Sequence, residues 1–201
     1  MATRRHPWRK IPDVLTAEEQ EALLKQPNLR YPTGQRNRLI LQLMLSTGLR
    51  LAETTALLWR DIDLHAGRLQ VQRGRGARER VLWIGDADLG ALRDWHGRQA
   101  RDVAGRPEHV FTTLEGKPVS GRYVQAMVKR YAQKAGIEKN VHPHLLRHTF
   151  AADIYRETSN IRVAQKALGH ADLSTTQIYT HLVEEELEGA LKSFRYASVR
   201  A

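Results

Sequence analysis

The chain has 201 residues, enough to bury a hydrophobic core, and a hydrophobic share of 41% argues against wholesale disorder. It has no cysteine, which excludes disulfides, thiolate zinc sites and a cysteine nucleophile. Its 32 Lys and Arg against 22 Asp and Glu give a net charge of +10, and a positive field of this size attracts polyanions, of which nucleic acid is the commonest.

The first 14 residues have the pattern of an arm, because they are basic, contain Pro7 and Pro12, and lack periodicity. They lead into no apolar segment, so they do not resemble a signal peptide. The best apolar stretch further along, residues 39–45, is interrupted by Gln42 and is far shorter than the roughly 20 residues of a membrane span. No membrane association is therefore expected.

A domain is predicted from residue 15 onward, and it opens with helices. Residues 16–19 have the capping-box pattern, so a helix should begin near Ala17 and end at Pro27. Residues 35–47 are apolar on nearly every side, which predicts a buried central helix that ends at Gly48. A further helix is predicted to open at once and to carry Arg50, Leu51, Glu53, Leu57 and Leu58.

The strand signals are few and short. Two alternating stretches, residues 68–72 and 80–84, flank a turn that contains Gly74 and Gly76, and together they predict a β-hairpin. Residues 110–111 predict one more short strand. Only a small antiparallel sheet is therefore expected.

Helices are predicted for most of the remaining chain. Ser120 has the position of an N-cap for a helix that runs to about Ala135 and is closed by Gly136. The other predicted helices span residues 87–103, 143–157, 160–168, 173–181 and 183–195. The expected fold class is mainly α with a small antiparallel sheet (α+β), in one domain over residues 15–201.

Three residues of possible chemical function, His144, Arg147 and His148, share one face of the helix that follows Pro143. Two imidazoles and a guanidinium suit a phosphate, because Arg offers a planar fork of donors and His can donate or shuttle a proton. Together with His142, the histidines can instead be metal ligands, or each can be structural. A metal is the weaker interpretation, because Arg147 would repel a cation and no thiolate is available.

Arg50 and Glu53 lie three residues apart at the start of a predicted helix. They can form an ordinary surface ion pair, or Glu53 can hold the guanidinium in place for binding. Further on, Gly169 ends one predicted helix and Tyr179 stands on the next. Most tyrosines are partly buried and hydrogen-bonded, and tyrosine is a poor nucleophile because its pKa is near 10, so Tyr179 would need nearby cations.

The order and spacing of these residues resemble the catalytic domain of the tyrosine recombinases, the phage-integrase family. The resemblance runs from about Leu15 to Leu191. The matching features, in chain order, are Thr47-Gly-Leu-Arg50-Leu-Ala-Glu53, the arginine-rich hairpin about 25 residues on, His144-x-x-Arg147, Leu168-Gly-His170, and Tyr179 nine residues after that histidine.

The resemblance implies a site-specific recombinase or integrase that cleaves and rejoins duplex DNA through a 3′-phosphotyrosyl intermediate, without metal, ATP or any other cofactor. The residue matching Tyr179 would attack the phosphorus. The positions that match phosphate binding and proton transfer in the family are Arg50, Arg147, His144 and His170. Glu53 matches an acidic position that steadies the site.

One position departs from the family pattern. The family's hairpin usually carries a lysine as the general acid, whereas this chain has Arg75 there and no lysine between Lys25 and Lys117. An arginine is a poor proton donor near neutrality because its pKa exceeds 12. Either Arg75 serves mostly electrostatically, or His144 or His170 takes over the acid role, or cleavage is slow.

The chain also lacks room for the N-terminal core-binding domain of many family members. It is either a naturally short recombinase, which Met1 favours, or a fragment. A lone catalytic domain has less surface for phosphate contacts, which predicts modest affinity and steep salt dependence. The expected partners are double-stranded DNA, further copies of the chain in a tetramer on DNA, and accessory DNA-bending proteins. The expected location is the cytoplasm, in association with the nucleoid.

Six basic residues are candidates for contacts with DNA, without a distinction between base and phosphate. They are Arg73, Arg78, Arg80, Arg122, Lys129 and Arg130. The last predicted helix, residues 183–195, has an apolar stripe that either packs on its own domain or docks onto a neighbouring protomer.

Three other functions stay open on sequence grounds. A type IB topoisomerase-like relaxase would use the same chemistry without synapsis. A DNA-binding protein of the same fold with weak or lost catalysis is favoured only by Arg75. A metal-dependent phosphoesterase would use the histidines, and its activity would be abolished by EDTA.

Overall fold

The structure, a computed structural model, describes residues 13–72, 79–102 and 107–169. Its elements are α1 Ala17–Leu24, α2 Pro32–Thr47, α3 Leu51–Thr55, the 3-10 turn η1 Trp59–Asp61, β1 Ile62–Asp63, β2 Arg68–Val71, β3 Arg80–Trp83, α4 Asp86–Asp102, α5 Gly121–Lys134, α6 Pro143–Thr158 and α7 Ile161–Leu168. The predicted class, mainly α with a small antiparallel sheet, is confirmed. The N-terminal arm to residue 12 and the helices predicted over 173–181 and 183–195 lie outside the described residues.

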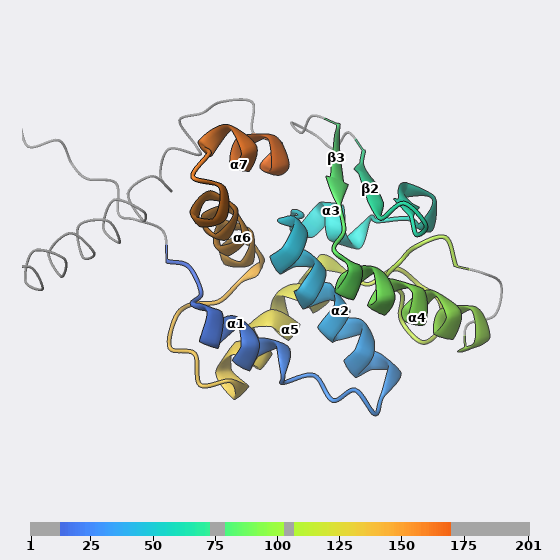
Figure 1. Cartoon of the computed structure of the whole chain (residues 1–201). Helices are drawn as coiled ribbons and strands as arrows, with labels where there is room; N and C mark the ends of the chain where they lie inside the picture. Colours follow the sequence, from blue (N-terminus) through green and yellow to red (C-terminus); the bar gives the residue numbers. More distant parts are fainter. Residues whose placement is uncertain (1–12, 73–78, 103–106, 170–201) are drawn as a thin grey trace, which may run out of the picture.

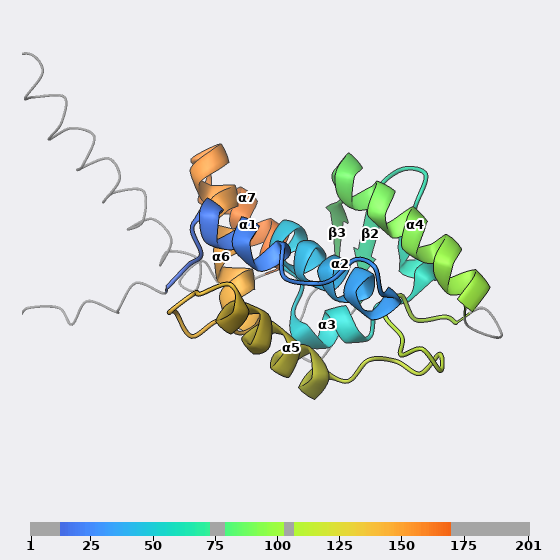
Figure 2. The same cartoon turned by 90° about the horizontal axis from the view of Figure 1, so that it is seen from below.

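Helix α2 is the centre of the fold, as its apolar sequence predicts. Its residues Leu39, Ile40, Leu41, Leu43 and Met44 are all buried in one continuous core. Helices α1, α4 and α6 pack against it (Figure 1). Seen from below, α3 and α5 lie on one side of α2 and α4 lies on the other (Figure 2). None of the described helices is both long and apolar enough to cross a membrane.

The predicted helix ends are set by local chemistry. Thr16 and Glu19 form the expected capping box, in which each side chain accepts a hydrogen bond from the other residue's backbone N–H at 3.2 and 2.8 Å. Helix α2 begins at Pro32, three residues earlier than predicted, because proline at the first helical position needs no hydrogen-bond acceptor. It ends at Gly48, whose φ of 62° is the left-handed conformation that glycine adopts without strain.

Two predictions in the next segment are wrong. The helix after Gly48 is only α3, with Arg50 as its N-cap, and Leu57 and Leu58 lie beyond it. These leucines instead pair with a distant segment: the Val110 N–H donates to the Leu57 carbonyl at 2.9 Å. Val110 and Phe111 are buried, but they do not form the predicted strand; isolated bridges lie on either side of them, at His109 and Thr112.

The predicted hairpin is confirmed, with β2 and β3 antiparallel and Arg68 opposite Trp83. A third strand, β1, was not predicted; it has two residues and pairs with β2. Alternation sends Arg80 and Leu82 of β3 inward, whereas Val81 and Trp83 point to solvent. Arg80 therefore faces the interior of the domain.

Helices α5 to α7 complete the wall of the site. The Ser120 hydroxyl caps α5 by accepting from the Tyr123 N–H at 3.1 Å, as predicted. The bounds of α6 and α7 agree with the predicted ones within one residue. Helix α6 packs on α2, α5 and α7, and α3 packs on α5.

Candidate active site

One face of α6 presents two of the predicted residues. Pro143 occupies the first helical position, and the His142 ring caps the helix by accepting from the Leu145 N–H at 3.2 Å. His144 is exposed, whereas Arg147 is buried, with 3% of its surface accessible. The His144 ring meets the His148 ring edge-on at 4.3 Å between centroids. The helix therefore orders a histidine and a buried arginine side by side.

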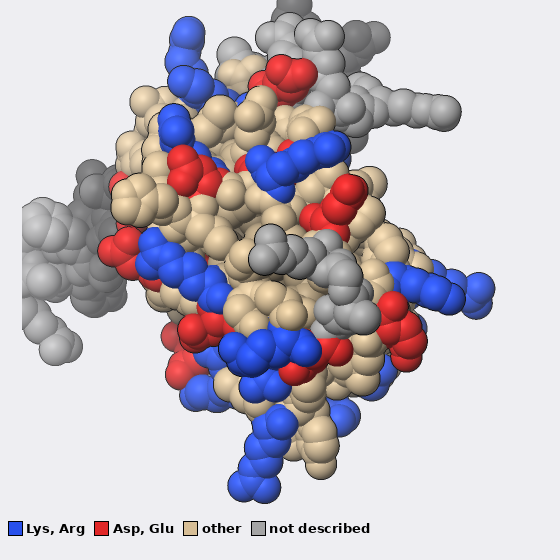
Figure 3. All heavy atoms as spheres, turned by 90° about the vertical axis from the view of Figure 1, so that its right-hand side faces the viewer, with Lys and Arg blue, Asp and Glu red and all other residues tan. Residues whose placement is uncertain are grey.

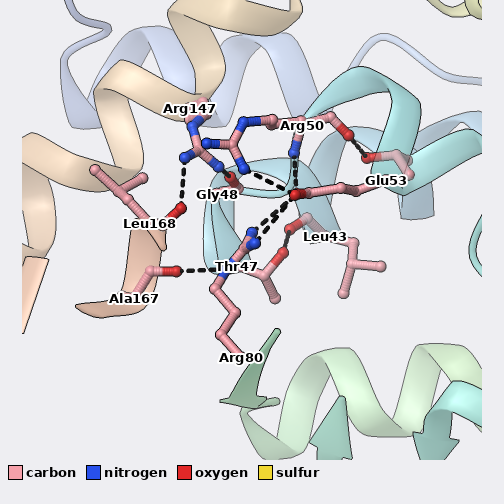
Figure 4. A network of polar contacts seen from close by, with 10 residues as sticks. Leu43, Thr47, Gly48, Arg50, Glu53, Arg80, Arg147, Ala167 and Leu168 are labelled. Atoms are coloured by element: carbon pink, nitrogen blue, oxygen red, sulfur yellow. Dashed lines mark hydrogen bonds and ion pairs between the residues drawn. The ribbon is translucent and has the colours of Figure 1, made fainter. Parts of the chain in front are cut away.

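Arg147 is fixed by the ends of two other helices. Its Nη1 donates to the Gly48 carbonyl at 2.5 Å, and its Nη2 donates to the Leu168 carbonyl at 2.6 Å (Figure 4). The C-terminal end of a helix carries partial negative charge and unsatisfied carbonyls, so it stabilises a guanidinium. The ends of α2 and α7 thus hold Arg147 in one orientation.

Arg50 is held by Glu53, the interaction that the sequence left open. The Glu53 carboxylate accepts from the Arg50 backbone N–H at 2.8 Å and from Arg50 Nη1 at 2.9 Å. The Arg50 side chain keeps 36% of its surface exposed, whereas Glu53 keeps only 8%. Glu53 therefore orients the guanidinium from the protein side and leaves part of it open to solvent.

Arg80 was predicted to contact DNA, and the structure contradicts this. Its side chain is 5% exposed, and it forms a two-pronged ion pair with the same Glu53, at 3.0 and 2.8 Å. Its Nε donates to the Ala167 carbonyl at 2.9 Å. The inward register on β3 buries this arginine, so it belongs to the interior of the site (Figure 4).

The charges of the site are shifted by these contacts. Burial raises the pKa of Glu53, but the hydrogen bonds and charge of Arg80, with the hydrogen bonds from Arg50, outweigh it and hold the pKa at about 2. Partial burial lowers the pKa of His144, although its side chain reaches solvent, and the positive charges of Arg147, His142 and Arg50 lower it further. Near neutral pH, Glu53 is an anion and His144 is neutral.

Three of the predicted catalytic residues lie within the described part of the chain: Arg50, His144 and Arg147. All three line one open pocket of about 650 Å³. The pocket lies between α3, α5 and the start of α6. It is lined by Arg50, Leu51, Ala52, Gln125, Lys129, Asn140, Val141, His142, Pro143, His144 and Arg147. Two fixed guanidiniums, a neutral imidazole and a lysine suit an oxyanion such as a phosphodiester, and the two guanidiniums can stabilise charge that develops on its oxygens.

The other predicted residues divide into three groups. Lys129 lines the pocket, and Arg122 and Arg130 of the same helix are exposed outside it, with Arg130 over the Tyr131 ring at 5.2 Å. Sequence reasoning missed Gln125 and Asn140, because a single polar residue on an exposed surface carries no distinctive pattern. Arg73, Arg75, Arg78, His170 and Tyr179 lie outside the described residues.

The described residues show neither a metal-binding cluster nor, around α4, a basic face. No group of three or more His, Cys, Asp or Glu among them is placed to hold a metal ion. On the face viewed in Figure 3, basic and acidic side chains are interspersed. The candidate site is therefore defined by the pocket between α3, α5 and α6.

Comparison with known proteins gives consistent results. The sequence model described as "Phage integrase family" matches residues 13–186. "Tyrosine recombinase XerC" of Xylella fastidiosa (strain 9a5c) is 44% identical over 174 residues, which cover 87% of this chain and 58% of that protein. "Tyrosine recombinase XerD" of Halalkalibacterium halodurans is 36% identical over 188 residues, 92% of this chain and 62% of that one.

Solved structures give the same picture. The crystal structure of XerA recombinase has a TM-score of 0.78 at 29% identity and covers 93% of this chain and 66% of its own. A post-cleavage complex of the XerH site-specific recombinase bound to palindromic difH substrate has a TM-score of 0.78 at 28% identity, over 92% of this chain and 54% of its own. The chain thus spans little more than half the length of several relatives that it matches.

Proposed function

The chain belongs to the phage integrase family, and from this premise we propose that it is a site-specific DNA recombinase that cleaves and rejoins duplex DNA. The observation that carries the proposal is the convergence of Arg50, His144 and Arg147 on one open pocket. These residues come from two elements far apart in the sequence, and a purely structural role would not require all three to face the same space. Relatives named tyrosine recombinases support the same activity.

The proposed reaction is a transfer of a phosphodiester to a tyrosine. The hydroxyl oxygen of Tyr179 attacks the scissile phosphorus and gives its proton to a neutral imidazole of the site; a bond to the enzyme forms, and the bond to the 5′-oxygen breaks as that oxygen takes a proton in turn. Arg50 and Arg147 stabilise the charge that builds on the non-bridging oxygens. The phosphotyrosyl ester retains the energy of the broken bond, so rejoining by a 5′-hydroxyl needs no ATP, and the two guanidiniums supply the charge that a metal would otherwise provide.

The leaving 5′-oxygen must receive a proton, and His144 and Arg75 are the residues to consider as its source. His144 is neutral near pH 7 because its pKa is lowered, so it can hydrogen-bond a phosphate oxygen and relay a proton. Arg75 occupies the hairpin position where the family usually has a lysine. This substitution favours a second candidate function, a DNA-binding protein of the same fold with weak or lost cleavage.

The proposal includes the partners that recombination requires. Duplex DNA would contact the pocket and Lys129, and four copies of the chain would assemble on two DNA sites, with DNA-bending proteins as possible helpers and the nucleoid as the place of action. The XerH site-specific recombinase, one of the structural neighbours, is bound to its palindromic difH substrate, which supports DNA as the partner.

Covalent trapping tests the proposal. Duplex sites would first be enriched from genomic DNA by binding to the protein, and then nicked next to the scissile position so that cleavage releases a short strand and traps the adduct. In EDTA, the wild type should give a protein–DNA band that survives denaturation, and Tyr179→Phe should give none. Tight binding without any adduct would select the second candidate, and recovery of the adduct by Arg75→Lys would assign the loss to that position.

A further inference from the structure

Arg80 joins three elements at the back of the pocket. It lies on β3, it pairs with Glu53 of α3 through both carboxylate oxygens, and it donates to the Ala167 carbonyl near the end of α7. A two-pronged pair between a guanidinium and a carboxylate fixes both groups in position and orientation. Since Glu53 in turn holds Arg50, the geometry of Arg50 depends on Arg80.

The pair also decides the charge that the pocket presents. Glu53 is a carboxylate with a pKa of about 2, and it is shared between two cations. With Arg80 in place, the three groups sum to +1, and the positive charge lies on the exposed Arg50. Without Arg80, Arg50 and Glu53 would sum to zero, so the Glu53 carboxylate would offset the charge that Arg50 offers to a bound phosphate.

We propose that Arg80 is a positioning residue, which neutralises Glu53 and holds it in place so that Arg50 meets the phosphate as a full, oriented cation. The inference rests on the proposed function of the pocket. Arg80 itself does not reach the pocket, because its side chain is 5% exposed and the pocket lining does not include it.

The contact with α7 extends this role to the second arginine. Ala167 and Leu168 are consecutive residues, and their carbonyls accept from Arg80 and Arg147, respectively. The next residue, Gly169, packs against Arg80 so closely that a Cβ there would come within 3.0 Å of Arg80 Cδ. Arg80 and Arg147 therefore hold the same helix end, and the two arginines of the pocket share one support.

The test uses the intact chain and begins with a readout that needs no cleavage. Inorganic phosphate would be titrated into wild type and variants, and the side-chain NMR signal of Arg50 would report binding. Arg80→Met should weaken phosphate binding at Arg50 about 10-fold, because the Glu53 carboxylate would then offset most of the Arg50 charge. Glu53→Gln combined with Arg80→Met should regain most of that affinity, because it removes the negative charge that offsets Arg50.

The controls distinguish a role of Arg80 in positioning Arg50 from a role in the stability of the fold. Arg98→Met removes an arginine from an ion pair with Asp102 on α4, on the other side of α2, and should leave phosphate binding unchanged. Arg80→Lys keeps the charge but not the two-pronged geometry, so it should bind phosphate better than Arg80→Met. If Arg80→Met does not fold, Arg80→Lys and the double variant carry the test.

Cleavage of nicked DNA is the second readout. Arg80→Met should slow single-turnover adduct formation about 100-fold, the size expected for a misplaced binding group. The proposal is overturned if Arg80→Met binds phosphate as well as Arg98→Met does, or if the double variant binds no better than Arg80→Met. If the wild type forms no adduct, the proposed recombination fails, and the phosphate titration still decides the role of Arg80.

Discussion

Two of the buried arginines in the described part of the chain, Arg36 and Arg80, belong to separate polar networks. The two networks differ in the groups that surround the guanidinium. Arg36 of α2 is 4% exposed, and it donates to neutral acceptors: the Thr112 carbonyl and the Tyr123 hydroxyl, each at 2.7 Å, and the Asn37 amide oxygen at 3.2 Å. Arg80 pairs instead with a buried carboxylate, which also binds Arg50. The Arg36 network joins groups inside the domain, whereas the Arg80 network includes Arg50, a partly exposed cation that lines the pocket.

This difference shows that burial of an arginine is not by itself a sign of function. The network of Arg36 ties α2 to α5 and to the loop at Thr112, so it secures packing. The network of Arg80, Glu53 and Arg50 secures the direction and charge of a group at the surface of the pocket. We therefore expect losses in the first network to lower stability and losses in the second to lower activity.

The largest effect is expected for Arg147→Met, which removes a buried cation that lines the pocket. Loss of one transition-state donor typically slows catalysis 10²- to 10³-fold, so single-turnover adduct formation should fall by about 10³. Arg36→Met serves as the matched control and should cleave at the wild-type rate per folded molecule. Equal rate losses in the two variants would remove the distinction between the networks.

Gly48→Ala should strongly destabilise the fold at the point where Arg147 is anchored. A Cβ at Gly48 would lie 2.2 Å from the Phe150 ring, and the residue has φ of 62°. We expect the free energy of unfolding to fall by about 3 kcal/mol, from overpacking and backbone strain together. Gly136→Ala, with φ of 71° and nothing within 4 Å, should cost about 1 kcal/mol in the same urea titration. Equal costs would refute the close contact.

Arg36→Met should lower the free energy of unfolding by about 2 kcal/mol, because it leaves the buried Thr112 carbonyl without the donor that Arg36 supplies. Urea unfolding measures this directly. Phosphate affinity at Arg50, followed by NMR, should stay at the wild-type value. A weakened phosphate affinity would mean that the Arg36 network also supports the pocket.

Two substitutions on α5, one of a lysine inside the pocket and one of an arginine outside it, test whether DNA contacts the pocket. Lys129→Gln should weaken DNA binding several-fold and reduce the salt dependence of log K by about 1, as expected for one lost phosphate contact. Arg130→Gln should have a smaller effect, because Arg130 lies over Tyr131 and outside the pocket. Fluorescence anisotropy over a salt series would compare them, and a larger effect of Arg130→Gln would move the DNA contact to another face.

The smallest effect concerns pH. The ordinary pKa of Glu53 is 4.5 and its pKa in the folded protein is about 2, so its contribution to stability is complete above 4.5 and is lost as the pH falls toward 2. The stability difference between wild type and Glu53→Gln should therefore shrink as pH falls through this window. The difference between wild type and Arg36→Met should change less, because Arg36 donates to neutral acceptors and its charge is only the smallest of the causes that lower the pKa of the exposed Glu115. A flat curve for Glu53→Gln would contradict the ion pairs.

Local patterns in the sequence were sufficient to predict most of the described helices. The spacing of His144 and Arg147 placed both on one helix, and the three-residue step from Arg50 to Glu53 indicated their contact. Capping residues such as Thr16 and Ser120 fixed helix starts, since caps act within one turn. Short-range spacing is reliable because helix geometry alone determines which residues meet.

Long-range contacts account for the errors. Arg80 was assigned to DNA because it belongs to an arginine-rich stretch, although it alternates with Leu82 and Ile84 on the inward side of its strand. That alternation could have indicated burial, but Glu53 lies 27 residues away, and nothing in the sequence links the two. Likewise, Arg147 is held by the carbonyls of Gly48 and Leu168. These are backbone groups, which every residue has, so the sequence does not indicate the contacts.

The central claim is that the pocket presents a phosphodiester to Tyr179. The most direct measurement is to digest the trapped wild-type adduct with protease and nuclease and to identify by mass spectrometry the residue that carries the 3′-phosphate. The account predicts a phosphotyrosyl peptide containing Tyr179, formed in EDTA and absent from Arg147→Met under the same conditions. A nucleotide on any other residue, or an adduct that needs a divalent metal, would contradict it.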